Sequence, residues 1–147
     1  MRYIINQKDI EEAELILNYQ SENEEVKAAL LFMERCQRKL VGKSNGESLL
    51  ISPEEILYVE KVDDKTFVYT ESNELQVDMS LYSLELFLDS DNYFRCSKSM
   101  IINISKVERL KSLPSNRIDC TLQNGEHIII SRTYASDFRK LLKGERA

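Results

Sequence analysis

The stretch that decides the fold is Asn92 to Leu113, NYFRCSKSMIINISKVERLKSL. The aromatic pair Tyr93-Phe94 leads into a polar, basic segment, and the β-branched run Ile101-Ile102-Asn103-Ile104 follows it. Such a run, bounded by polar residues, is typical of a β-strand. From residue 92 to residue 117 the chain carries six Lys and Arg against one acid. Because the whole chain has a formal net charge of −5, positive charge is concentrated here, and a polyanion is the partner that such a patch favours.

The composition is that of a soluble globular protein. A chain of 147 residues, 42% hydrophobic and 31% charged, suits one domain with a small appendage. No apolar run approaches the roughly 20 residues that a membrane helix needs, and residues 1–6 lack the pattern of a signal peptide. Three irregularly spaced cysteines (Cys36, Cys96 and Cys120) favour reduced thiols and a cytoplasmic protein. With one histidine and no CxxC motif, we expect no metal and no cofactor.

Acidic residues dominate the segment before this stretch. Residues 45–91 carry two basic and twelve acidic groups. Over roughly a Debye length of 8–10 Å the local field decides what a surface attracts, so an acidic chain can still bind nucleic acid. We therefore expect weak non-specific binding, with specificity carried by a few contacts.

Four consecutive elements share a known pattern. The segment Phe94 to Val107, FRCSKSMIINISKV, resembles the signature of LytTR-type DNA-binding domains. Upstream, Ile56 to Glu60 resembles a strand of that family and Ser80 to Glu85 the start of its helix, and downstream Leu122 to Arg132 resembles its hairpin. The resemblance covers about residues 47–143.

The fold class that we expect is mainly β. Short β-rich runs separated by turn residues follow residue 44, and the resemblance implies an elongated antiparallel multi-sheet β fold with short helices. Lys43 to Glu47 is small and polar, which favours a linker. We thus expect a small N-terminal α/β appendage at residues 1–44 and a LytTR-type DNA-binding domain at residues 45–147.

The appendage reads as two short strands, at residues 3–5 and 15–17, and one helix. Ser21 to Glu24 has the form of a capping box at the start of a helix over residues 21–41. Its apolar face is too broad to be buried within 44 residues, so we expect it to pack on a second copy and form a homodimer; packing on the main domain is the alternative.

Two local signals stand out in the main domain. Ser80 is expected to cap a short helix with Leu81, Leu84 and Leu88 on one face. Asn124-Gly125 indicates a hairpin with a type I′ turn, and a last helix is expected over about residues 133–142.

The resemblance also implies which residues meet double-stranded DNA. No helix has the form of a recognition helix, so loops and strand ends would read the grooves. The first contact falls on Lys65, in a loop between two early strands, and the second on Arg95, Lys98 and Ser99. The third falls on Ser131, Arg132 and Thr133, where threonine replaces an arginine of the family pattern. For Lys65 the alternative is an exposed turn lysine, for Arg95 to Ser99 a solvated strand end, and for Ser131 and Thr133 helix capping. Asn103 matches the motif but is expected to make a structural hydrogen bond.

The function that follows is a sequence-specific DNA-binding transcriptional regulator, binding direct repeats or half-sites as a homodimer. Residues 1–44 are too few for the receiver domain of many family members, so a partner could supply the signal; a membrane-protein partner is not shown by the sequence. An alternative is a protein-interaction module acting through the N-terminal helix, with weak or vestigial DNA binding. An enzyme built on Cys120, Asp119 and His127 is disfavoured, because Cys120 and His127 each sit in an apolar strand. The DNA sequence, the input signal and the direction of regulation are not encoded in any recognisable pattern.

Overall fold

A computed structural model describes residues 1–37, 39–88 and 90–144. The chain forms two compact units, Met1–Arg38 and Lys39–Ala147.

The first unit contains one helix, α1, at Glu24–Gln37. The Val26 N–H donates to the Asn23 Oδ1 at 2.9 Å, so Asn23 caps the helix. The expected capping box at Ser21 therefore lies too early in the chain. The strands expected at residues 3–5 and 15–17 are wrong, since the described part of the chain has no strand before α1. Short apolar segments form strands only where a neighbouring strand can pair with them.

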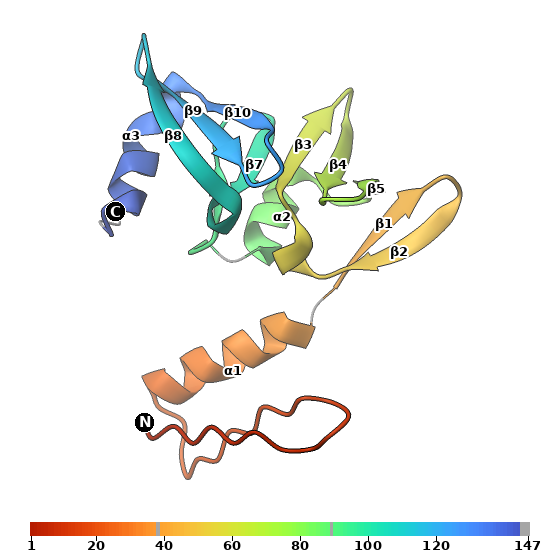
Figure 1. Ribbon diagram of the computed structural model, residues 1–147, viewed down its shortest axis with the longest axis vertical. Coiled ribbons are helices and arrows are strands. Elements are labelled where there is room, and N and C mark those ends of the chain that lie inside the picture. The colour runs from red at the N-terminus through yellow and green to blue at the C-terminus, as the bar shows by residue number, and fades with distance from the viewer. Residues whose placement is uncertain (38, 89, 145–147) are drawn as a thin grey trace. The chain divides into compact units, whose positions relative to one another are not determined.

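The second unit consists of two antiparallel sheets and two longer helices (Figure 1). The seven-stranded sheet has the order β2-β1-β5-β4-β3-β7-β6, and the three-stranded sheet the order β10-β9-β8. The strands of the larger sheet are β1 Leu40–Ser44, β2 Glu47–Ile51, β3 Tyr58–Val62, β4 Lys65–Tyr69, β5 Glu74–Val77, β6 Tyr93–Arg95 and β7 Met100–Asn103. Those of the smaller sheet are β8 Val107–Leu113, β9 Arg117–Leu122 and β10 His127–Ile130, and the helices are α2 Leu81–Phe87 and α3 Arg132–Leu142. This mostly β architecture confirms the expected fold class.

The segment expected to be a linker is a hairpin turn. β1 and β2 pair along their whole length, from Leu40 with Ile51 to Ser44 with Glu47. Asn45 and Gly46 between them have φ values of 50° and 79°, as a type I′ turn requires. The boundary between the two compact units therefore lies before β1, at residues 38–39, rather than after residue 44.

The hairpin at Asn124-Gly125 is present, but its turn differs from the expected type. Of these two residues only Gly125 has a positive φ, 89°. The Gly125 N–H donates to the Leu122 carbonyl, and the Leu122 N–H donates to the Glu126 carbonyl. This pattern is that of a longer loop that ends on a left-handed glycine.

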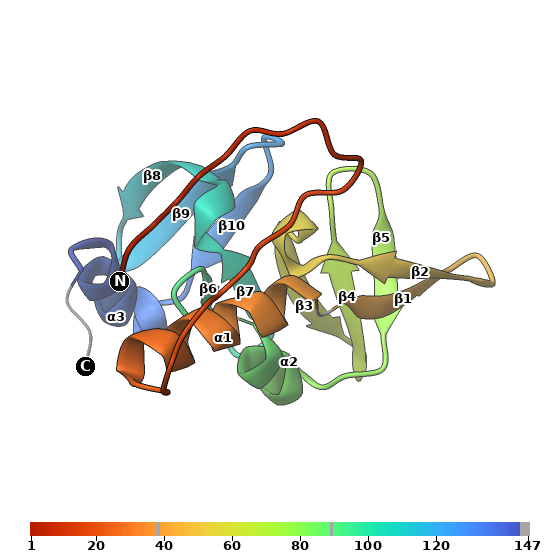
Figure 2. The ribbon, with the colours of Figure 1, turned by 90° about the horizontal axis from the view of Figure 1, so that it is seen from below.

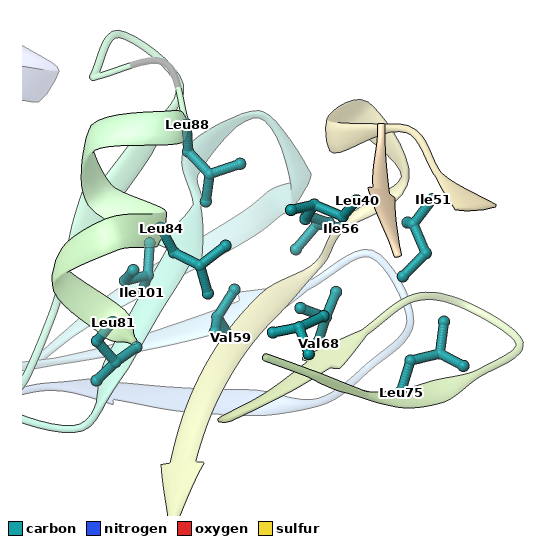
Figure 3. Packing of buried hydrophobic residues seen from close by; sticks show 11 residues of the cluster. Leu40, Ile51, Ile56, Val59, Val68, Leu75, Leu81, Leu84, Leu88 and Ile101 are labelled. Atoms are coloured by element: carbon teal, nitrogen blue, oxygen red, sulfur yellow. The ribbon is translucent and has the colours of Figure 1, made fainter. Parts of the chain in front are cut away.

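Alternate residues of the central strands face two different cores. Val59 and Ile101 pair across β3 and β7 and pack against α2, in a cluster with Leu81, Leu84 and Leu88 (Figure 3). Their neighbours Tyr58 and Ile102 point the other way, into a second cluster with the three-stranded sheet and α3. The larger sheet thus has α2 on one face and, at its β3–β7 end, the smaller sheet and α3 on the other (Figure 2).

Polar side chains fix the start of α2 and the end of β7. The Ser83 N–H donates to Ser80 Oγ at 3.1 Å, so the expected cap of α2 is present. Asn103 is buried, and its Nδ2 donates to the Ile56 carbonyl at 2.8 Å. Its Oδ1 accepts from the Ser105 N–H at 3.1 Å and from Ser105 Oγ at 2.7 Å. Asn103 is therefore a structural residue, as the sequence predicts. No helix among the described residues has the length and apolar character to cross a membrane.

Gly42 allows the β1–β2 hairpin to approach β5 closely. A Cβ at this position would lie 2.8 Å from Leu75 Cβ and 2.8 Å from Ile51 Cδ1. Because Leu75 Cβ is fixed to the backbone of β5, we expect Gly42→Ala to destabilise the protein by about 1–3 kcal/mol. Thermal unfolding measures the effect, with Lys43→Ala on the same strand as a control that should stay close to the parent chain. An unchanged midpoint for Gly42→Ala would contradict this packing.

Candidate nucleic-acid interface

The turn between β6 and β7, residues 96–99, is held from within by Arg95. The Arg95 Nε donates to the Ser97 carbonyl at 2.8 Å, and its Nη2 donates to the Lys98 carbonyl. Its Nη1 donates to Glu85 Oε1 of α2 at 2.6 Å. The guanidinium thus uses its fork of donors on the protein itself, which makes Arg95 a residue that positions the turn.

Two serines complete this turn. The Ser99 N–H donates to Ser97 Oγ at 3.2 Å, and the two hydroxyl oxygens lie 3.5 Å apart. Lys98 between them is exposed. No hydrogen bond or ion pair holds its ammonium within the described part of the chain. The turn therefore presents the free ammonium group of Lys98 on a backbone that hydrogen bonds of Arg95 and Ser97 hold in place.

Backbone hydrogen bonds join this turn to the two other segments that the sequence singled out. The Lys61 N–H of β3 donates to the Ser99 carbonyl at 2.8 Å. The Ser131 N–H, at the end of β10, donates to the Cys96 carbonyl at 3.0 Å. Residues 61–65, 96–99 and 131–133 come from distant parts of the sequence, and these two bonds bring them to one region of the fold.

Cations gather around an open depression of about 510 Å³ beside this turn. Lys61, Lys65, Arg95 and Lys98 line it, together with Asp64 and Asp78. Lys61 Nζ lies 3.8 Å from Asp64 Oδ1, and Lys43 Nζ lies 3.4 Å from Asp78 Oδ2, so both aspartates have a partner. Lys65 and Lys98 are exposed and remain available to an anion.

The start of α3 adds a further cation. Ser131 occupies the N-cap position without a side-chain capping bond, while its carbonyl accepts from the Tyr134 and Ala135 N–H groups. Arg132 and Thr133 follow as exposed residues. The capping alternative for the Ser131 hydroxyl therefore receives no support, and Arg132 is free to reach outward.

The rest of the basic stretch lies elsewhere. Lys106 precedes β8, Arg109 and Lys111 lie in it, and Arg117 begins β9, where its Nε donates to the Pro114 carbonyl at 3.3 Å. The run of six cations that is continuous in sequence is therefore divided between the β6–β7 turn and the three-stranded sheet. Sequence reasoning missed Lys61, which lies opposite Thr66 in the β3–β4 hairpin and lines the same depression as Lys65.

An enzymatic site at the β9–β10 hairpin does not assemble. The Cys120 side chain is fully buried, and burial raises the pKa of its thiol to about 12. His127 is exposed on the other face of the hairpin, where its Nδ1 lies 2.9 Å from Asp119 Oδ1. The thiol and the imidazole therefore cannot form a nucleophilic pair. Cys96 is likewise a buried free thiol, and the Cys36 side chain lies outside the described part of the chain.

Chemically, the exposed surface near the turn combines free lysines and an arginine with hydroxyl groups, which are the donors that phosphate oxygens and base edges accept. Among the described residues no group of three His, Cys, Asp or Glu could hold a metal ion.

Comparison with known proteins identifies the same region. The family model of the LytTr DNA-binding domain matches residues 46–143. The sensory transduction protein LytT of Bacillus anthracis is 28% identical over 82% of this chain and 48% of its own length. The transcriptional regulatory protein YpdB of Escherichia coli K12 is 26% identical over 65% of this chain and 40% of its own length. The chain thus spans less than half the length of these relatives.

A solved structure shares the fold. The LytTr DNA-binding domain of a response regulator from Bacillus cereus superposes with a TM-score of 0.69 at 28% identity, covering 72% of this chain and 97% of that one. The family model matches residues 46–143, and the fold is shared with a solved member of the family. This chain therefore belongs to the LytTr DNA-binding domain family.

Proposed function

We propose that this protein is a sequence-specific DNA-binding transcriptional regulator of the cytoplasm that reads successive grooves with loops and strand ends. The observation that carries the proposal is the convergence of residues 61–65, 96–99 and 131–133 through two backbone hydrogen bonds. Relatives named for sensory transduction and transcriptional regulation support it.

Within this surface the residues have different roles. Lys65, Lys98 and Arg132 are exposed and offer the long cationic side chains that reach phosphates or base edges. Ser99, Ser131 and Thr133 offer shorter hydroxyl contacts beside them, and the Thr133 methyl suits a thymine methyl. Arg95 acts by holding the turn, because each of its three side-chain nitrogens already donates to a group of the protein. Insertion of separate loops into successive grooves favours bent DNA.

The proposed assembly is a homodimer on a pair of half-sites, with residues 1–44 contributing to dimerisation. α1 supports this role because Leu31 and Phe32 expose 52% and 58% of their surface. The same feature favours the second candidate function, a protein-interaction module whose helix binds a partner, such as a membrane protein, while DNA binding is weak.

Selection of bound oligonucleotides from a random duplex pool tests the proposal. We expect enrichment of a short motif that recurs at about one helical turn, and an affinity that falls steeply between about 50 and 200 mM salt as counterions are released. A mobility shift on the selected sequence, against a scrambled duplex, measures the specificity. A protein that neither enriches a motif nor is retained on heparin would refute DNA reading and favour the interaction module.

The role of Arg95 has its own prediction. Arg95→Gln removes the bond to Glu85 and is expected to cost about 1–2 kcal/mol of stability. More specifically, we expect faster amide hydrogen exchange at Ser97 and Ser99, since the turn loses its internal support. Lys98→Gln is the matched control, because it makes the same charge change in the same turn without a structural bond. Equal exchange in the two variants would argue against a positioning role.

A further inference from the structure

The outer strand of the seven-stranded sheet has a free edge. β2 is the terminal strand, and β1 is the only strand that pairs with it among the described residues. Figures 1 and 2 both show the β1–β2 hairpin projecting from the larger sheet beyond β5. Among the described residues of the second unit, no strand pairs with the outer side of β2.

The hairpin register shows which backbone groups are unpaired. In a hairpin closed by a two-residue type I′ turn, the residues that flank the turn, here Ser44 and Glu47, exchange hydrogen bonds. The pattern alternates, so Leu49 and Ile51 also face β1, while the N–H and C=O groups of Ser48 and Leu50 point outward. The pairing of Lys43 with Gln76 of β5, on the opposite side of β1, follows the same alternation.

Three of the five side chains of β2, those of Leu49, Leu50 and Ile51, are apolar. Leu50 exposes 68% of its surface and lies opposite Val41, which exposes 52%. The central residues Ser48, Leu49 and Leu50 carry no charge.

β8, one of the two edge strands of the other sheet, is different. β8 exposes Glu108, Arg109 and Lys111, and charges of this kind prevent edge-to-edge pairing. In β2 the charged residue, Glu47, lies next to the turn, and the middle of the strand lacks this protection.

We propose that β2 pairs with β2 of a second copy of this chain, antiparallel and about a two-fold axis at Leu49. In this register Ser48 lies opposite Leu50 of the second copy, and Leu50 lies opposite Ser48 of the second copy. Each of these two pairs exchanges two backbone hydrogen bonds. The four bonds use every outward N–H and C=O group of the strand. Glu47 lies opposite Ile51, so no like charges meet. The two Leu50 side chains become diagonal neighbours at about 7–8 Å, within reach of each other and of Val41.

A second copy fits this edge because the strand is complementary to itself in the one register that pairs all its free groups. A two-fold contact is closed and does not propagate into a filament. A pair of five-residue strands buries less surface than the roughly 1,200 Å² of a stable interface. We therefore expect a weak dimer with a dissociation constant of about tens of micromolar. DNA would favour this dimer, because it holds two copies close together. This last step rests on the proposed function: the two-fold axis would arrange the DNA-contacting surfaces of the two copies for an inverted repeat.

Sedimentation of the full chain without DNA tests the contact independently of DNA binding. We expect a concentration-dependent dimer that Leu50→Pro abolishes, since proline removes an outward N–H and leaves the bonds to β1 intact. Leu50→Val is the matched control, which keeps the N–H and should remain dimeric. A parent chain that stays monomeric to several hundred micromolar, or a dimer that survives Leu50→Pro, would overturn the proposal.

Disulfide trapping checks the register even if Leu50→Pro fails to fold. In a Cys36→Ser background, Leu49→Cys places a thiol directly opposite its symmetry mate in a non-hydrogen-bonded pair, where the Cβ atoms lie about 4.5–5.5 Å apart. Mild oxidation is expected to give a covalent dimer for Leu49→Cys and much less for Ser48→Cys. Equal yields, or none for Leu49→Cys, would overturn the two-fold at Leu49.

Discussion

The double variant Lys65→Glu/Lys98→Glu is expected to lose DNA affinity by about 100-fold or more at roughly 150 mM salt. Both lysines are exposed and line one depression, so one duplex can contact them together. Each lost phosphate contact lowers the slope of log affinity against log salt by about one, so the slope should fall by about two. Fluorescence anisotropy over a salt series measures both quantities.

A matched control separates local contact from overall charge. Lys106→Glu/Lys111→Glu changes the net charge by the same amount, on or beside β8 and outside the depression. We expect this control to weaken binding by only a few-fold. If the two double variants lose affinity equally, the interaction is a general effect of charge and the proposed surface is wrong.

Phe138→Ala is expected to destabilise the protein by about 3–5 kcal/mol and to lower the unfolding temperature by more than about 10 °C. Phe138 is fully buried, and its ring centroid lies 5.3 Å from that of Phe94 at an interplanar angle of 52°. Truncation leaves a cavity between α3 and the strand that leads into the Arg95 turn. The loss should therefore also loosen the junction between residues 96 and 131.

Calorimetry measures this loss, with Leu142→Ala as the control on the same helix. Leu142 is 47% exposed, so its truncation should change stability by less than about 1 kcal/mol. Equal effects of the two variants would contradict the placement of α3 over the second core. Phe138→Leu should recover part of the stability, because it refills most of the volume.

The sequence predicted those elements whose signals are local. The cap of α2 rests on Ser80 and Ser83, three residues apart, and it forms as expected. Asn103 likewise has its structural role, which a polar residue inside a β-branched run indicates. The strands expected at residues 3–5 and 15–17 failed because strand formation depends on a neighbour that no local pattern encodes. Asn45-Gly46 carried the type I′ signal, yet the small polar residues around it were interpreted as a linker.

Arg95 is a residue whose contacts the sequence motif does not predict. Its place in the signature implied a DNA contact, but its actual partners are the Ser97 and Lys98 carbonyls and Glu85, ten residues upstream in α2. That assignment required the packing of α2 against β6. Lys61 went unnoticed for a related reason, since only strand pairing places it at the Ser99 carbonyl.

The sequence by itself determined that this chain is mainly β, belongs to the LytTr family and concentrates cations around residues 95–117, because alternation, turn chemistry and motif spacing are properties of neighbouring residues. Only the tertiary structure decided which cations share a surface. It placed Lys65 and Lys98 at one depression and tied Ser131 to Cys96, while it moved Arg109 and Lys111 to another sheet. The physical reason is that a polyanion is attracted by cations that lie within about a Debye length of one another in space. Hydrogen bonds between strands that are distant in the sequence set those distances.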